Sequence, residues 1–265
     1  MNMMVIVISA ALVGIVALLI GLLLGVAGKF FHVEVDEKEI AVRGELPGNN
    51  CGGCGYPGCD GLAAAIAAGK ASPNACPVGG ADVAEKIAAI MGVDASAAVR
   101  EVAYVKCAGT CDKAVQRGNY YGAEDCRQAA VVPGKGAKAC EYGCMGFGTC
   151  VKACPFDAIH IVNGVAVVDK EACKACGKCI AVCPNELIEL IPYEAKTAVG
   201  CSSHDKGKET RLVCASGCIG CGICVKQCED GAITVENNLA HIDQSKCTGC
   251  GKCAEKCPTK AIKML

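Results

Sequence analysis

The apolar residues divide the chain into an uninterrupted apolar N-terminus and a longer cysteine-rich remainder. Residues 3–28 include no charged side chain, and about 25 helical residues at ~1.5 Å each span the ~30 Å hydrocarbon core of a bilayer. A signal peptide usually has a positive start, a shorter apolar region and a cleavage site. Here no Lys or Arg precedes the stretch and Lys29 follows it. The pattern predicts an uncleaved single-pass anchor in the cytoplasmic membrane, with the rest of the chain on the cytoplasmic side.

Beyond the anchor, the apolar pattern changes from segment to segment. Residues 30–45 are polar and Val-rich, which indicates a linker or a short strand. Residues 62–70 are Ala-rich and residues 81–91 are amphipathic, so both are expected to be helical. Later in the chain, alternating apolar residues flank Asn163-Gly164 and again Asn237-Asn238. These turn residues tolerate positive φ, so each pattern predicts a β-hairpin.

The composition indicates that metal sites supply part of the core. The chain has 265 residues with 25 cysteines, 33 glycines, four phenylalanines and no tryptophan, and small domains with thin cores rely on disulfides or metals. The odd cysteine count and the clustering of cysteines in runs disfavour disulfides, and zinc sites prefer paired Cys knuckles, often with His. So many thiols indicate a reducing compartment. A net charge of −1 gives no support to nucleic-acid binding.

Two cysteine runs near the C-terminus have the spacing of a bacterial ferredoxin. The spacing C-x2-C-x2-C-x3-C predicts two [4Fe–4S] clusters, with the fourth cysteine of each run binding the other cluster. Its members are Cys218, Cys221, Cys224 and Cys228, followed by Cys247, Cys250, Cys253 and Cys257. A shift of 74 positions superposes an upstream unit on this one, which indicates two copies of one domain. The matching upstream cysteines are Cys150, Cys154, Cys173, Cys176, Cys179 and Cys183.

The upstream copy departs from the plain spacing at its start. Cys140-x3-Cys144-x5-Cys150 is interpreted as the same run with residues inserted between its first three ligands. Cys154 is expected to cross to the second cluster of this copy and Cys183 to return to the first. In the downstream copy, Glu229 stands where a proline is usual, and a local change of turn is expected there.

A different cysteine set follows the anchor. Cys51, Cys54, Cys59 and Cys76 have the spacing C-x2-C-x4-C-x16-C, among glycines that let backbone N–H groups turn toward sulfur. Alone this set would also suit zinc. Beside the ferredoxin runs, a [4Fe–4S] cluster is favoured.

The anchor, the segment Asn50-Cys51-Gly-Gly-Cys54-Gly-Tyr-Pro-Gly-Cys59-Asp and the segment from Cys140 to Cys154-Pro-Phe-Asp-Ala-Ile resemble the B subunit of the Rnf ion-translocating electron-transport complex. The resemblance covers essentially the whole chain and implies five [4Fe–4S] clusters with iron bound by 20 cysteines. The implied sets are Cys51, Cys54, Cys59 and Cys76; Cys140, Cys144, Cys150 and Cys183; Cys154, Cys173, Cys176 and Cys179; Cys218, Cys221, Cys224 and Cys257; and Cys228, Cys247, Cys250 and Cys253.

The expected fold class is α+β, with six segments along the chain. They are a transmembrane helix (1–29), a small helical [4Fe–4S] domain (30–95), a Cys-containing linker (96–138), a first ferredoxin-like domain (139–192), a connector (193–213) and a second ferredoxin-like domain (214–265). Both ferredoxin-like domains are of the bacterial 2[4Fe–4S] type.

The resemblance implies an electron-transfer subunit of a ferredoxin:NAD oxidoreductase coupled to Na⁺ or H⁺ translocation. Its implied partners are soluble ferredoxin, membrane lipid and the other membrane and peripheral subunits. The sequence has no strand–GxGxxG–helix, no Walker loop and no nucleophilic constellation, so no catalytic residue is expected in this chain alone. The alternatives are a membrane-tethered polyferredoxin that serves a different reductase, and a redox sensor, for which no output domain is visible.

Five cysteines remain outside the implied sets: Cys107, Cys111, Cys126, Cys201 and Cys214. Free cysteines are among the most buried residues, and the spacing C-x3-C-x14-C matches no compact cubane loop. Buried thiols are therefore the expectation. The alternative is a sixth cluster that uses the first three of these residues and one of the last two.

Overall fold

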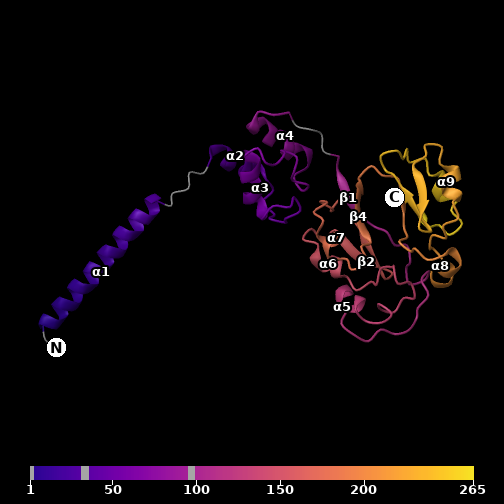
Figure 1. Cartoon of the computed structure of the whole chain (residues 1–265), viewed down its shortest axis with the longest axis horizontal. Coiled ribbons are helices and arrows are strands. Elements are labelled where there is room, and N and C mark those ends of the chain that lie inside the picture. Colours follow the sequence, from indigo (N-terminus) through magenta and orange to yellow (C-terminus); the bar gives the residue numbers. More distant parts are fainter. Residues whose placement is uncertain (1–2, 31–35, 95–98) are drawn as a thin grey trace.

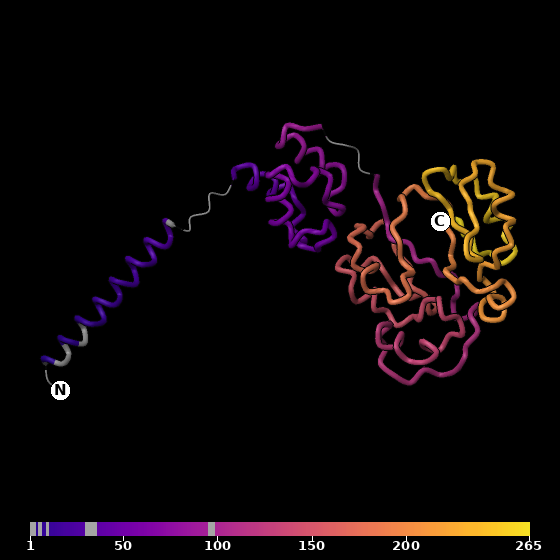
Figure 2. Tube along the Cα trace, viewed as in Figure 1, coloured from indigo at the N-terminus to yellow at the C-terminus, as the bar shows by residue number. Residues whose placement is uncertain are grey.

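The computed structural model describes residues 3–30, 36–94 and 99–265 of the 265-residue chain (Figures 1 and 2). Helix α1 (Met3–Phe30) comes first and ends beside Lys29. Within it, Ala11–Lys29 is long and apolar enough to cross a membrane, and none of that window is buried. The exposed leucines and isoleucines of this helix are those expected of a lipid-facing surface.

Three helices form the small domain after the anchor: α2 (Glu37–Glu45), α3 (Gly58–Ala67) and α4 (Gly80–Met91). Their core consists of buried aliphatic side chains around Leu62, Ile66 and Ile87. The prediction of a linker or strand before residue 46 is wrong for residues 37–45. Asp36 caps α2 by accepting from the backbone N–H of Lys38, and Val42 is buried. Residues 31–35 lie outside the described residues.

The first ferredoxin-like domain contains the predicted hairpin of its repeat. Strands β2 (Ile159–Val162) and β3 (Val165–Val168) pair antiparallel around the turn at Asn163-Gly164. Two short helices, α6 (Thr149–Ala153) and α7 (Lys178–Val182), each begin after a glycine in the left-handed region. A residue with a Cβ atom would be strained in that conformation. The glycine lets the chain change direction between the cysteine loop and the start of the helix.

The second ferredoxin-like domain repeats this arrangement. Strands β6 (Ile233–Glu236) and β7 (Leu239–Ile242) form its hairpin. Its short helices are α9 (Ile223–Gln227) and α10 (Lys252–Glu255), again each preceded by a left-handed glycine. The chain therefore has a mixed α+β fold with two tandem copies of one unit.

Each copy also contains a strand pair that joins its two ends. Strand β1 (Glu101–Val105) pairs with β4 (Ile188–Pro192), and β5 (Thr197–Val199) pairs with β8 (Ile262–Met264). The sequence pattern predicts a linker at β1 and a connector at β5. Each of these segments contributes a strand that pairs with a strand of the ferredoxin-like domain that follows it.

The segments after β1 and β5 bring the two copies together. The N–H of Ala108 donates to the carbonyl oxygen of Gly200 at 2.7 Å. Helix α5 (Cys126–Ala130) belongs to the first of these segments and α8 (Gly207–Val213) to the second. Figure 1 shows the second copy, in yellow, beside the first.

Candidate functional site

Three cavities in the ferredoxin-like region are each lined by four cysteines. Their volumes are similar, about 410, 400 and 340 Å³. Among the described residues, no three Cys, His, Asp or Glu side chains converge closely enough to hold a single metal ion. A tetrahedral zinc needs four sulfurs at about 2.3 Å from one centre. Thiols spread around a cavity suit a larger inorganic core such as a cubane.

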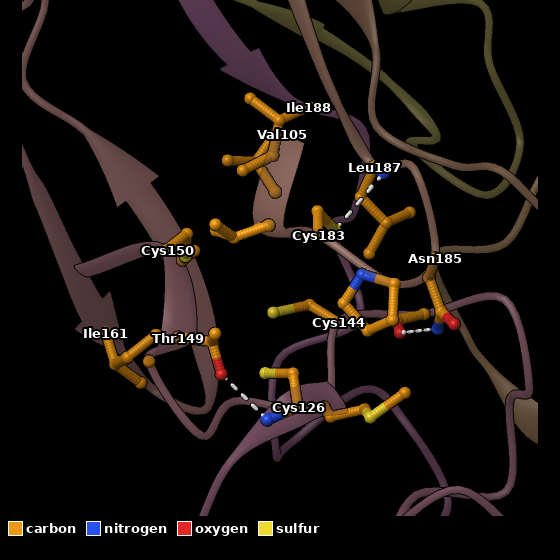
Figure 3. A pocket seen from close by; sticks show the side chains of 16 residues that line it. Val105, Cys126, Cys144, Thr149, Cys150, Ile161, Cys183, Asn185, Leu187 and Ile188 are labelled. Carbon is orange, nitrogen blue, oxygen red and sulfur yellow. Dashed lines mark hydrogen bonds between the residues drawn. The ribbon is translucent and has the colours of Figure 1, made fainter. Parts of the chain in front are cut away.

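The first cavity is lined by Cys126, Cys144, Cys150 and Cys183 (Figure 3). Cys144, Cys150 and Cys183 belong to one predicted set, whose fourth member is Cys140. The fourth predicted member, Cys140, does not line this cavity. Cys126, expected to be a spare thiol, occupies the fourth position instead.

Helix α5 holds Cys126 against the ferredoxin-like domain. Asp125 caps this helix by accepting from the N–H groups of Arg127 and Gln128. The N–H of Cys126 donates to Thr149 Oγ1 at 2.7 Å, and that hydroxyl donates to Asp125 Oδ2 at 3.0 Å. Thr149 begins α6, which carries Cys150. The cap thus holds Cys126 at Thr149, as Figure 3 shows, and its thiol is close enough to raise the pKa of Cys150.

The repeat offers a reason for the position of Cys126. The 74-residue shift places Cys144 on Cys218 and Cys150 on Cys224 with no insertion between them, and it places Phe147 on Cys221. This alignment gives a second interpretation beside that of a run with inserted residues. The run would start at Cys144, with Phe147 where the other copy has its middle cysteine, and Cys126 lines the same cavity as Cys144 and Cys150.

The second cavity is lined by Cys107, Cys140, Cys201 and Cys214, and we call it the bridging cavity. Cys140 and Cys214 are related by the same 74-residue shift, and Cys107 and Cys201 each follow the end of an equivalent strand, β1 or β5. Each copy therefore contributes one equivalent pair. Backbone pairing keeps the segments together, through an isolated bridge between Ala114 and Cys214 and another between Gln116 and Lys138.

The thiols of the bridging cavity have the same surroundings as the predicted ligands. Backbone N–H groups donate to Cys154, Cys183 and Cys228 sulfurs at 3.3–3.4 Å. The N–H of Cys144 donates to Cys107 Sγ at 3.3 Å, and the N–H of Ser203 to Cys201 Sγ at 3.4 Å. Such N–H···S bonds stabilise the negative charge of a thiolate and tune cluster potentials.

Burial raises the thiol pKa of predicted ligands and of Cys201, which was not expected to be a ligand. It raises the pKa of the Cys150 thiol to about 12 and that of Cys224 to about 11. Burial also raises the pKa of Cys201 to about 11, and the nearby thiols of Cys218 and Cys140 act in the same direction. Such thiols remain neutral in water, and bound iron would deprotonate them.

Members of the other predicted sets lie near one another. Cys218, Cys221, Cys224 and Cys257 line the third cavity. In each remaining set, burial raises the pKa of one thiol and close set members raise it further: Cys54 and Cys59 act on Cys76, Cys173 and Cys176 on Cys179, and Cys247 and Cys250 on Cys253. Cys111 is exposed and lines none of the three cavities.

The small N-terminal domain contacts the first ferredoxin-like domain through its cysteine loop. A Cβ atom added at Gly53 would lie 2.7 Å from the carbonyl oxygen of Cys176. Burial raises the pKa of Cys176, and among the neighbouring thiols Cys51 raises it most, followed by Cys154. The glycine thus permits two cysteine sets from separate domains to approach closely.

Three family models match the chain, and all describe iron–sulfur binding. Residues 46–78 match a family described as "Putative Fe-S cluster", residues 149–194 an "LdpA Fe-S cluster-binding domain", and residues 240–263 a "4Fe-4S binding domain". They cover the N-terminal cysteine set and parts of both ferredoxin-like copies. The chain therefore has iron–sulfur cluster-binding domains of the [4Fe–4S] type.

Curated relatives match almost the whole chain. The B subunit of the Na(+)-translocating ferredoxin:NAD(+) oxidoreductase complex of Acetobacterium woodii is 50% identical over 91% of this chain and 72% of its own length. The B subunit of the ion-translocating oxidoreductase complex of Methanosarcina acetivorans is 42% identical over 92% and 93%. The B subunit of the proton-translocating ferredoxin:NAD(+) oxidoreductase complex of Clostridium ljungdahlii is 42% identical over 87% and 82%. With this identity, coverage and cysteine architecture, the chain belongs to the family of B subunits of the ion-translocating oxidoreductase (Rnf) complexes.

Proposed function

We propose that the chain is the electron wire of a membrane-bound ferredoxin:NAD⁺ oxidoreductase. By electron wire we mean a series of neighbouring clusters that passes electrons one at a time. The observation that supports this most directly is the continuous succession of cysteine-lined sites from one end of the folded region to the other. The clusters would supply one-electron carriers. The residues of this chain hold them by thiolate ligation, donate N–H···S bonds and keep water away from the buried sulfurs.

We propose six [4Fe–4S] clusters in place of the five implied by the resemblance. The first cavity takes a cluster on Cys126, Cys144, Cys150 and Cys183, and the bridging cavity takes one on Cys107, Cys140, Cys201 and Cys214. The matched cavity volumes and N–H···S bonds support both sites. Six sets of four then use every cysteine except Cys111.

The contacts between neighbouring sets order five of the six proposed clusters, and the Cys228 set shares a core with Cys218 and Cys224 in the C-terminal domain. The third cavity lies beside the bridging cavity, because the thiols of Cys218 and Cys201 are adjacent. The bridging cavity lies beside the first, because the N–H of Cys144 donates to Cys107 Sγ. The first connects through α6 to the Cys154 set, and Cys176 of that set lies beside Cys51. Electrons would thus pass from the C-terminal domain to the N-terminal one, or back.

Iron content distinguishes six clusters from five. The anaerobically purified chain is expected to contain about 24 iron atoms, as against about 20 for five clusters. Cys126→Ala and Cys140→Ala are each expected to lose about four iron atoms, because each residue binds a different cluster. Cys111→Ala is the matched control and should keep the full content. Full iron content in Cys126→Ala, with a loss in Cys140→Ala, would restore the original five-cluster grouping.

The wire function predicts a division of labour between this chain and its partners. Reduced ferredoxin is expected to reduce the clusters of the isolated, reconstituted chain, which should then fail to reduce NAD⁺ without other subunits. Visible bleaching of the clusters and NADH formation measure the two steps. NAD⁺ reduction by the pure chain would refute the proposal. Co-purification with a different reductase, in place of ion-translocating subunits, would favour the tethered polyferredoxin.

We propose that the cluster domains lie on the cytoplasmic side of the membrane. The uncharged helix followed by Lys29 supports this orientation. Protease added to sealed right-side-out vesicles should therefore leave residues 36–265 intact, and detergent should expose them. Digestion of the ferredoxin-like domains in sealed vesicles would reverse the orientation.

A further inference from the structure

A buried lysine lies between the first cavity and the bridging cavity. Lys138 is only 7% exposed. Its ammonium donates to three backbone carbonyl oxygens, those of Gly109 at 2.8 Å, Cys144 at 3.0 Å and Gly164 at 2.6 Å. Cys144 lines the first cavity, while Gly109 and Lys138 itself line the bridging cavity.

The three carbonyl groups solvate this ammonium but do not neutralise it. Within the described part of the chain, no carboxylate forms an ion pair with Lys138. A buried charge is costly unless a counter-charge accompanies it. A cubane held by four thiolates is anionic, so a cluster in each flanking cavity would supply that counter-charge.

We propose that Lys138 tunes electron transfer through its charge. Its positive charge, held in place by the three carbonyl groups, raises the reduction potentials of the clusters in the first cavity and in the bridging cavity. This inference rests on the proposed function, because it requires clusters in those cavities. Reduction adds one negative charge to a cluster, and a nearby cation in a low-dielectric interior stabilises the reduced form. Burial disfavours the added charge, and none of the thiols that line these two cavities is exposed.

The test compares the midpoint potentials of individual clusters in reconstituted full-length chains. Lys138→Met removes the charge and keeps the length of the side chain, Lys138→Gln removes the charge but keeps N–H donors, and Lys138→Arg keeps the charge. Lys113→Met is the matched control, since Lys113 is an exposed lysine near Cys214 and its charge is screened by water. EPR-monitored redox titration gives the potentials, and Cys126→Ser and Cys201→Ser identify the two signals.

Both neutral variants are expected to shift the two flanking clusters to more negative potentials and to leave the clusters of the Cys51 and Cys228 sets unchanged. Lys138→Arg and Lys113→Met should stay near wild type. Unchanged potentials in a neutral variant that retains both clusters would overturn the proposal. If both neutral variants lose these clusters, Lys138→Arg decides: retention at near wild-type potentials supports the role of charge, and loss shows that only the shape of the lysine matters.

The wild-type measurements separate this inference from the proposed function. Iron near 20 atoms per chain and no signal removed by Cys201→Ser would reject the bridging cluster. The effect of Lys138 would then still be tested by the reduction potential of the cluster on Cys126, Cys144, Cys150 and Cys183, compared between wild type and the Lys138 variants.

Discussion

Replacing Cys201 by alanine is expected to interrupt the wire and to slow electron exchange between its two halves strongly. Cys201 comes from the second copy and lines the bridging cavity, the proposed contact between the two ferredoxin-like domains. Without that cluster, electrons from reduced ferredoxin should reach the C-terminal clusters at the normal rate. Reduction of the N-terminal clusters should slow by more than an order of magnitude, because electrons must then cross the gap left by the missing cluster. Freeze-quench EPR after mixing with reduced ferredoxin measures both phases.

This expectation assumes that electrons from reduced ferredoxin enter at the clusters of the C-terminal domain. Cys221 and Cys250 of that domain are exposed, whereas the ligands around the first cavity are buried or half-buried. Cys111→Ala is the control, because its thiol is exposed and lines none of the three cavities. If Cys201→Ala passes electrons to the N-terminal clusters at the wild-type rate, the path does not run through the bridging cavity.

Substitution of Gly53 by alanine should have the second-largest effect, at the other end of the wire. The added Cβ would lie 2.7 Å from the carbonyl oxygen and 3.0 Å from the Cα of Cys176. Backbone cannot yield easily, so the N-terminal domain must move away from the Cys154 set. Electron transfer between clusters slows as their separation grows, and we expect transfer to the Cys51 cluster to slow severalfold.

Iron content should remain at the wild-type value in Gly53→Ala, because Gly53 holds no metal and its φ is not in the left-handed region. Gly44→Ala is the matched control in the same domain, since a Cβ there has nothing within 4 Å. Equal rates in the two variants would show that the contact between Gly53 and Cys176 plays no part in electron transfer. Loss of iron in Gly53→Ala alone would indicate that the glycine shapes the cluster loop itself.

The sequence predicted those parts of the fold that depend on residues close together in the chain. Both hairpins occur at the expected turns, and Asn163 and Asn237 adopt positive φ there, at 47° and 48°. The apolar helix and the helices near residues 62 and 81 also follow from local pattern. The strand pairs β1–β4 and β5–β8 could not be predicted in this way, because their partners lie far apart and their three to five residues include no turn signal.

The proposed regrouping of the cysteines differs from the sequence prediction for a related reason. Spacing assigned Cys140 to the run that follows it, although its equivalent, Cys214, lay outside the matching run of the other copy. The 74-residue shift, applied to Cys140 and to Phe147, pairs Cys140 with Cys214 and places a phenylalanine where the other copy has a cysteine. The place of Cys126 in the first cavity could not be predicted from spacing, because it depends on the capped α5 helix and the hydrogen bond to Thr149.

The bridging cavity also has a mechanical consequence. Two of its cysteines come from each copy, so a cubane bound there would cross-link the domains much as a disulfide ties distant segments of a chain. Iron loading and the docking of one domain on the other then become a single linked equilibrium. Removal of iron from this one site would take away that cross-link and leave the docking of the two copies to backbone contacts such as the Ala108–Gly200 hydrogen bond and the Ala114–Cys214 bridge.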